Sequence, residues 1–150
     1  MPLHEVIYFS LASEEMDAGK LDRLLSRCRS ENEKTGITGV LVFYEREFLQ
    51  LLEGEESDVL ALYARIENDL RHQQIYKLWD GPIAARSYGQ WAMAFIDQEL
   101  LNAMPQAVHP SGFGRGLANA VKDSTGKKLL LNLRDEFLQR EAEQPRSPTQ

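Results

Sequence analysis

The sequence predicts an α+β sandwich in which two helices cross one face of a five-stranded mixed β-sheet. Short apolar runs with a period of two alternate along the 150 residues with two longer segments of helical period. Both faces of the expected sheet are apolar, although two crossover helices can cover only one of them. Further apolar segments of helical spacing follow residue 97, and we expect them to cap the second face.

The first two elements are a strand and a helix. Residues 5–10 form a short β-branched and aromatic run that is typical of a strand. Asp17 is placed to cap a helix, because its carboxylate can accept hydrogen bonds from free backbone N–H groups of the first turn. The apolar positions at helical spacing are Leu21, Leu24, Leu25 and Cys28. We expect this helix to end between residues 32 and 36.

Two strands and a second helix follow. Residues 37–44 and 47–53 predict strands joined by a tight hairpin at 45–46. Gly54 ends the second strand, and the glutamates at 55–56 favour a helix start, because the helix dipole stabilises carboxylates there. The apolar stripe of the second helix consists of Val59, Leu62, Tyr63, Ile66 and Leu70.

The last part of the sheet comes from residues 75–96. Segments 75–79 and 83–87 predict one strand that is bent or bulged near 81–82, where Gly and Pro adjoin. Segment 91–96 predicts the final strand, with Trp91 and Met93 on one face. The complete order of strands and helices is that of a ferredoxin-like sandwich.

The chain divides into three expected parts. Residues 1–97 form the sandwich domain, 98–140 form a C-terminal helical cap, and 141–150 form a disordered tail rich in polar residues and proline. The apolar residues of the cap are Phe113, Leu117 and Val121 in one helix, and Leu129, Leu130, Leu133, Phe137 and Leu138 in another.

Composition argues against several classes of function. The 17 Lys and Arg residues against 23 Asp and Glu give a net charge of −6, which disfavours nucleic acid and anionic membranes as direct partners. Because Cys28 is the single cysteine and no apolar stretch is long enough to span a membrane, we expect a cytoplasmic protein. Scattered histidines predict no metal site, and the sequence has no Gly-rich phosphate loop.

Several polar or amphipathic side chains lie in apolar surroundings, where an unpaired polar group costs about 1–3 kcal/mol. They are Tyr8, Asn32, Gln50, Trp91 and Met93. The first and third strands of a ferredoxin-like sheet are neighbours, so Tyr8 and Gln50 are expected within hydrogen-bond reach. Ordinary explanations remain open: core packing, pairing with backbone, or a helix C-cap at Asn32. Arg65 and Asp69 form either a solvated ion pair or part of a phosphate site.

Taken together, the motifs resemble the BLUF family, sensors of blue light that use a flavin. The resemblance runs from residue 3 to about 97 in the family's order. The stretches that carry it are Ile7-Tyr8-Phe9-Ser10, Asn32 with Thr35-Gly36-Ile37-Thr38-Gly39-Val40-Leu41, Phe48-Leu49-Gln50-Leu51-Leu52-Glu53-Gly54, Tyr63-Ala64-Arg65-Ile66, Asp69-Leu70-Arg71-His72 and Trp91-Ala92-Met93. Glu31 departs from the neutral or basic residue that members often carry.

The resemblance implies a flavin held non-covalently between the two helices, with FAD expected and FMN as the alternative. Tyr8 would donate an electron and a proton to the excited flavin. Gln50 would bridge the Tyr8 hydroxyl and the flavin N5/O4 edge, and Asn32 would bind the O4/N3 side. Other residues expected along the cofactor are Ile37 and Ile66 beside the ring, and Arg65, Asp69 and His72 toward the ribityl-phosphate end. Trp91 and Met93 would relay the signal.

The resulting hypothesis is a non-enzymatic blue-light photoreceptor that signals to an unidentified partner protein or through rearrangement of a homo-oligomer. A first alternative is a ferredoxin-like ligand-binding or dimerisation module without flavin, in which the polar residues satisfy one another. A second is a flavin-dependent oxidoreductase, which would need an open substrate site beside the ring.

Overall fold

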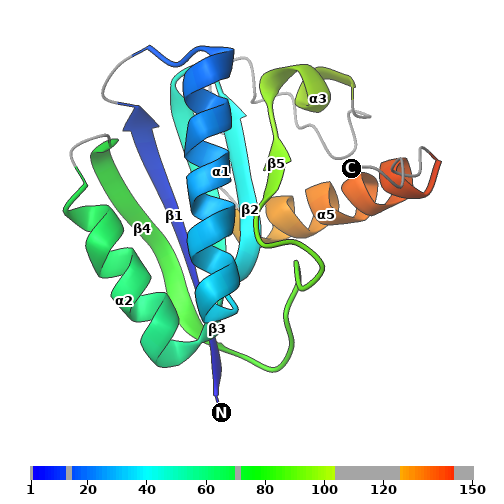
Figure 1. The fold of residues 1–150 in the computed structure, drawn as a ribbon. Coiled ribbons are helices and arrows are strands. Elements are labelled where there is room, and N and C mark those ends of the chain that lie inside the picture. The colour runs from blue at the N-terminus through cyan, green and yellow to red at the C-terminus, as the bar shows by residue number, and fades with distance from the viewer. Residues whose placement is uncertain (1, 13–14, 70–71, 104–125, 144–150) are drawn as a thin grey trace.

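The computed structural model describes residues 2–12, 15–69, 72–103 and 126–143. In chain order the elements are β1 (Leu3–Ala12), α1 (Ala18–Thr35), β2 (Thr38–Tyr44), β3 (Glu47–Glu55), α2 (Glu56–Glu67), β4 (His72–Ile83), β5 (Ala94–Ile96), α3 (Gln98–Ala103) and α5 (Gly126–Glu143) (Figure 1). The predicted α+β sandwich with a five-stranded mixed sheet is confirmed.

The sheet has the strand order β4-β1-β3-β2-β5. β1 pairs antiparallel with β3 and β4, β2 pairs antiparallel with β3, and β5 runs parallel to β2. The register places Tyr8 of β1 opposite Gln50 of β3, which confirms their predicted adjacency. The hairpin between β2 and β3 turns at Glu45, whose φ is 59°.

Asp17 caps the start of α1 as predicted, whereas the residue that caps its end is Gly36 and not Asn32. The Asp17 carboxylate accepts a hydrogen bond of 2.8 Å from the Lys20 backbone N–H, and this bond is the main cause that lowers the pKa of Asp17. At the other end Gly36 adopts a left-handed conformation with φ of 74°, which glycine reaches without a Cβ penalty. The backbone N–H groups of Gly36 and Ile37 both donate to the Asn32 carbonyl, so the end of α1 is fixed beside β2.

Helices cover both faces of the sheet. α1 and α2 lie side by side on one face, where Val6, Leu25 and Val59 belong to one core cluster (Figure 1). On the opposite face Leu130 and Leu133 of α5 are fully buried in a second cluster built on the sheet. The predicted packing of the C-terminal helix on this face is therefore confirmed for Leu130 and Leu133, whereas the side chain of Leu129 lies outside the described residues.

Two sequence predictions about the end of the sheet are wrong. Residues 83–87 do not form a strand beyond Ile83, because the N–H group of Ser87 is bound by the Glu53 carboxylate instead of a neighbouring strand. β4 runs without interruption through 81–82, and its register shifts lie opposite the Ile7/Tyr8 and Phe9/Leu11 steps of β1. A proline is tolerated in β4 because this strand is at the sheet edge.

The final strand is also shorter than predicted. β5 begins at Ala94, so Trp91 and Met93 lie in the irregular chain that precedes it. Strand alternation does not apply there, and the two side chains do not share a face. Trp91 belongs to the cluster under α5, whereas Met93 belongs to the cluster under α1 and α2.

Parts of the predicted cap fall outside the described residues, among them Phe113, Leu117 and Val121. α5 continues to Glu143, past the boundary expected at 140. The division into parts at 97 and 140 otherwise stays a prediction. Among the helices of the described residues, none combines the length and the apolar character that crossing a membrane requires.

Candidate functional site

The centre of the candidate site is a hydrogen bond between two buried side chains of neighbouring strands. The Tyr8 hydroxyl donates to Gln50 Oε1, and Tyr8 and Gln50 are 1% and 5% exposed. The Gln50 amide nitrogen donates to Met93 Sδ at 3.6 Å. A thioether is a weak acceptor, so this amide retains donor capacity for a stronger partner. Gln50 therefore links a phenol on one side to Met93 on the other.

Tyr8 is held in its neutral form. Burial raises the pKa of the Tyr8 phenol well above 10.0, and Cys28, Tyr63 and Asp69 raise it further. The Tyr63 ring lies edge-on to the Tyr8 ring, with centroids 5.4 Å apart. The phenol therefore stays protonated, and because loss of an electron alone would leave a strongly acidic radical cation, an electron can leave Tyr8 readily only together with its proton. Gln50 Oε1 is the acceptor already in place for that proton.

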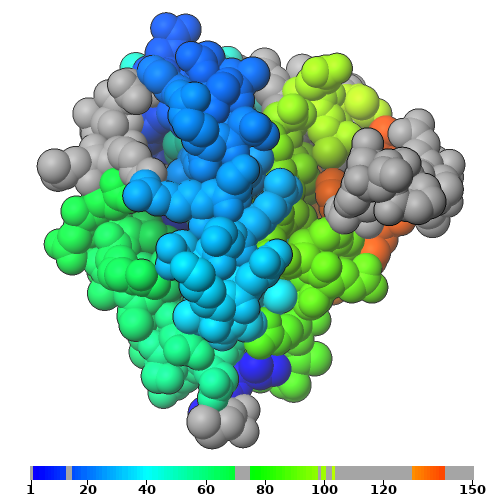
Figure 2. Space-filling model, viewed as in Figure 1, coloured from blue at the N-terminus to red at the C-terminus, as the bar shows by residue number. Residues whose placement is uncertain are grey.

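A cavity of about 310 Å³ opens beside this pair, between α1, α2 and the sheet. Its volume falls at the small end of the range of about 300–1,000 Å³ that is usual for ligand sites. The space-filling view shows α1 and α2 packed side by side over this face (Figure 2). The lining residues are Tyr8, Leu24, Arg27, Cys28, Glu31, Asn32, Leu41, Phe48, Gln50, Leu52, Leu62, Arg65, Ile66, Asp69 and Met93.

Asn32 joins the cavity to the chain before β5. It is 2% exposed, and its side-chain N–H donates to the Ala92 carbonyl at 2.7 Å. One helical turn away, Arg29 Nε donates to the Met93 carbonyl at 3.0 Å. The backbone next to Met93 is thus held by two side chains of α1, one of which also lines the cavity.

The cavity brings together most of the residues predicted to contact a cofactor. Arg65, Ile66 and Asp69 of the second helix region line it, together with the residues of the Tyr8 and Gln50 pair. Ile37 is buried but is not among the lining residues; it packs near Gly54 and Val59. His72 begins β4, and its side chain lies outside the described part of the structure.

Trp91 does not lie beside Gln50. Its ring is 5.8 Å from the Tyr88 ring and 5.2 Å from the Phe137 ring of α5, on the opposite side of the sheet from the cavity. Met93 is the neighbour of Gln50. The two residues predicted to relay a signal therefore contact different layers of the molecule.

Sequence reasoning missed the contribution of α1 to the cavity wall. Leu24, Arg27, Cys28 and Glu31 line it together with Asn32. Leu24, Cys28 and Asn32 follow one another at steps of four residues, and Arg27 and Glu31 do the same, so all five share one helix face; this signal was available in the sequence. Arg27 and Arg65 bring positive charge to the cavity from one helix each, and Glu31 and Asp69 bring negative charge.

The site has the properties that a flavin ring requires. Leucine, isoleucine and phenylalanine side chains supply apolar walls, and a phenol and two carboxamides supply donors and acceptors on one side. The fold and the site together define a flavin-binding sensor module.

Comparison with known proteins places the chain in a family. Residues 3–94 match the family model described as "BLUF: Sensors of blue-light using FAD". The chain belongs to the BLUF family, whose members bind a flavin and sense blue light. This family is one of sensors, which supports the expectation that the module is not catalytic.

Curated relatives share the module but are much longer. The chain is 33% identical over 98 residues to the blue light- and temperature-regulated antirepressor BluF of Escherichia coli, covering 65% of this chain and 24% of that protein. It is 31% identical over 93 residues to photoactivated adenylate cyclase subunit alpha of Euglena gracilis, covering 61% and 9%. The chain thus spans a quarter or less of these two relatives.

Solved structures share the fold over more of the chain. The dark-state structure of the BLUF protein BlrB superposes with a TM-score of 0.76 at 24% identity, covering 90% of this chain and 97% of that one. Klebsiella pneumoniae BlrP1, solved with FMN and cyclic diGMP, gives a TM-score of 0.62 at 31% identity, covering 70% and 27%.

Proposed function

We propose that the cavity between α1 and α2 binds FAD non-covalently and that Tyr8 and Gln50 are the photoactive pair. The observation that carries this proposal is the buried Tyr8–Gln50 hydrogen bond on the cavity wall. When bound, the flavin supplies absorption of blue light and an excited state that takes up an electron.

Each residue of the pair has a distinct task. Tyr8 gives up an electron together with its proton, because the raised pKa keeps the phenol protonated and a phenol that loses only an electron becomes a very strong acid. Gln50 Oε1, which already accepts the Tyr8 hydrogen bond, would relay this proton toward the flavin. When the electron and the proton return to Tyr8, Gln50 is left with amide donor and acceptor exchanged, since one carboxamide carries both groups. No bond to the cofactor forms, and nothing is consumed.

The exchange at Gln50 changes its contact with Met93. In the present arrangement an amide N–H faces the Met93 sulfur at 3.6 Å. After the exchange a carbonyl oxygen would face that sulfur, and two acceptors in contact repel each other. Met93 would then move, together with the backbone that Asn32 and Arg29 hold.

The remaining cavity residues are assigned to the cofactor's other parts. Asn32 binds the polar edge of the ring and Ile66 lies beside the ring. Arg65 and Asp69 contact the ribityl-phosphate end, because a guanidinium is suited to a phosphate. Contacts of Ile37 and His72 with the cofactor stay predictions. FAD is favoured over FMN because FAD stands in the family description and two arginines line the cavity.

The output is proposed to pass to a separate protein or through a homo-oligomer, in the cytoplasm. The relatives named above combine the same module with an adenylate cyclase or act as an antirepressor. The described part of this chain holds the sensor module and α5, so the helix over the second sheet face is the element best placed to report its state.

One sample tests the proposal. Purified protein is reconstituted with FAD, and its absorption is recorded in the dark, under blue light and after return to darkness. We expect yellow protein with a small, reversible red shift. Mass analysis of the chromophore released from the protein as purified, before any FAD is added, separates FAD from FMN. A colourless protein after reconstitution would support the ligand-binding or dimerisation module, and dark turnover with a nicotinamide donor would support an oxidoreductase.

A further inference from the structure

The chain between β4 and β5, residues 84–93, is anchored to the sheet by a buried carboxylate. Glu53 of β3 is 0% exposed, and its carboxylate accepts hydrogen bonds from the backbone N–H groups of Ser87 at 2.8 Å and Tyr88 at 2.7 Å. A third bond comes from the Thr38 hydroxyl at 2.9 Å. Charge-assisted bonds of this kind are about twice as strong as neutral ones, so residues 87–88 are fixed to the sheet.

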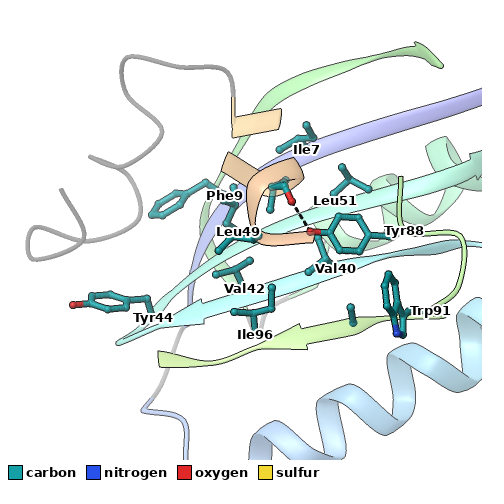
Figure 3. Packing of buried hydrophobic residues seen from close by; sticks show 13 residues of the cluster. Ile7, Phe9, Val40, Val42, Tyr44, Leu49, Leu51, Tyr88, Trp91 and Ile96 are labelled. Carbon is teal, nitrogen blue, oxygen red and sulfur yellow. Dashed lines mark hydrogen bonds between the residues drawn. The ribbon is translucent and has the colours of Figure 1, made fainter. Parts of the chain in front are cut away.

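Tyr88 reaches from this anchor to α5. Its ring is fully buried, and its hydroxyl donates to the Leu130 carbonyl at 2.6 Å (Figure 3). Burial raises the pKa of the Tyr88 phenol, so the hydroxyl stays a donor. Because Glu53 fixes the backbone of Tyr88, the Leu130 turn of α5 is tied to the sheet through one hydrogen bond.

The same chain contacts α5 at a second place. The Trp91 ring lies 5.2 Å from the Phe137 ring, edge to face. Phe137 is seven residues after Leu130, which corresponds to about 10 Å along a helix. Unlike Tyr88, Trp91 is two residues from Met93, the residue that contacts Gln50. The Tyr88–Leu130 contact with α5 is therefore fixed to the sheet, whereas the Trp91–Phe137 contact lies close in sequence to the residue that borders the cavity.

We propose that Tyr88 is a positioning residue that serves as a pivot for α5: a displacement of Trp91 tilts the helix about the Leu130 carbonyl. The inference rests on the proposed photoactive role of Gln50. Repulsion between Gln50 and Met93 moves the backbone of 91–93, and Trp91 moves with it against Phe137. Because the Leu130 turn is held in place, residues 134–143 of α5 move while residues 126–133 stay. The helix therefore tilts and remains bound to the sheet.

Hydrogen exchange on the full chain with FAD tests the pivot, with peptides 126–133 and 134–143 compared in the dark and under blue light. In the wild type we expect illumination to change exchange in 134–143 more than in 126–133. Tyr88→Phe keeps the ring and removes the hydroxyl. In the dark it should speed exchange in 126–133 about twofold to tenfold, the range expected for one lost hydrogen bond. Under light, both peptides should then respond alike.

A matched control is Tyr44→Phe, which removes a hydroxyl from the far end of the same core cluster (Figure 3). It should leave the exchange of both peptides as in the wild type. Glu53→Gln is the second variant, because a carboxamide cannot accept hydrogen bonds from all three donors. As in Tyr88→Phe, the difference in light-induced exchange between peptides 126–133 and 134–143 should disappear. Equal effects of Tyr44→Phe and Tyr88→Phe would overturn the pivot, because general core damage would then explain both.

The flavin spectrum distinguishes failure of the proposed photoactive function from failure of the Tyr88 pivot. A wild type without a light-induced red shift defeats the proposed function itself. If the red shift is present in Tyr88→Phe and the contrast between 126–133 and 134–143 also persists, only the pivot is wrong. Persistence of the red shift with loss of the contrast is the expected result, and a purely structural role of Tyr88 would not produce it.

Discussion

The two faces of the sheet are built from alternate residues of the same strands, yet they differ in kind. Toward α5, Ile7, Leu49 and Leu51 are fully buried among other apolar side chains (Figure 3). Toward α1 and α2, Tyr8 and Gln50 take their places and border a cavity. A shift of one residue thus separates a filled core from a ligand site. Substitutions of residues that face α5 should therefore change mainly stability, and substitutions of their sequence neighbours that face the cavity should change mainly the photochemistry.

Loss of the Tyr8 hydroxyl should have the largest effect on function. Tyr8→Phe keeps the aromatic ring and the cavity, so we expect flavin to bind. The reversible red shift should disappear completely, because phenylalanine can give neither the proton nor the hydrogen bond to Gln50. Absorption spectra before, during and after illumination measure this directly.

Tyr63→Phe is the control for this experiment. Its ring contacts that of Tyr8 in the same cluster, but it has no hydrogen bond with Gln50 in the described structure. This variant should keep the red shift. An unchanged red shift in Tyr8→Phe would show that another residue is the donor.

Leu51→Ala and Leu52→Ala compare the two faces at adjacent positions. Leu51 is 0% exposed in the filled core, and Leu52 is 1% exposed on the cavity wall. Leu51→Ala should cost about 3–5 kcal/mol, because it creates a new void as well as losing buried area. Leu52→Ala should cost about 2–3 kcal/mol in the flavin-free protein, since it only enlarges an existing cavity.

Denaturant unfolding of the flavin-free variants measures both changes, and spectra of the flavin-bound forms complete the comparison. The spectrum and photocycle of folded Leu51→Ala should match the wild type, whereas Leu52→Ala should change flavin affinity. Equal stability costs at the two positions would contradict the difference between the faces.

Much of this arrangement could be predicted, because it follows from regular periodicity. Alternation of period two and the ferredoxin-like strand order together placed Tyr8 opposite Gln50, and the structure confirms that pairing. Helical spacing placed Leu130 and Leu133 over the second face. In each case the local pattern determines the direction of the side chain.

Predictions failed where the chain is irregular. Trp91 and Met93 were assigned to one face by strand alternation, but both precede β5, where side chains of Asn32 and Arg29 bind the carbonyls of Ala92 and Met93. The buried role of Glu53 was not predictable either. Its partners are backbone N–H groups 34 and 35 residues away, and a backbone group leaves no signal in the sequence.

Buried tyrosines with raised pKa values lie on both faces, Tyr8 toward α1 and α2 and Tyr88 toward α5, and they predict sensitivity to alkaline pH. The folded pKa values of Tyr8 and Tyr88 lie above the ordinary value of 10.0, so the folded protein keeps these protons when the unfolded chain loses them. The stabilisation is complete below pH 10 and is lost as pH rises toward the folded values. Above pH 10 each tyrosine should contribute a slope of about 1.4 kcal/mol per pH unit.

Unfolding free energies measured between pH 9 and 11.5 test this expectation on both faces. Tyr8→Phe and Tyr88→Phe should each make the alkaline loss of stability less steep by about one tyrosine's slope. Tyr76→Phe is the control, because this side chain is 57% exposed. A control variant that changes the slope as much as the buried ones would refute the assignment.

The smallest expected effect lies at the sheet edge, away from both cores. His4 Nε2 lies 3.1 Å from the Asp80 carboxylate, and this hydrogen bond is the main cause that lowers the pKa of Asp80 below 3.8. Because the folded pKa is lowered, the stabilisation is present above about pH 4 and is lost as pH falls through the folded value. Asp80 is one-third exposed, so solvent and salt screen it, and Asp80→Asn should cost about 0.5 kcal/mol.

Thermal unfolding of Asp80→Asn and wild type is compared between pH 6 and pH 3. The variant should melt about 1–2 °C lower at pH 6, and the difference should shrink as the pH falls toward 3. High salt should remove most of the difference at pH 6, because the interaction is electrostatic. The flavin spectrum and the red shift should be the same in both proteins throughout, since Asp80 does not line the cavity in the described structure. A red shift that changes in Asp80→Asn would mean that the sheet edge and the cavity are coupled.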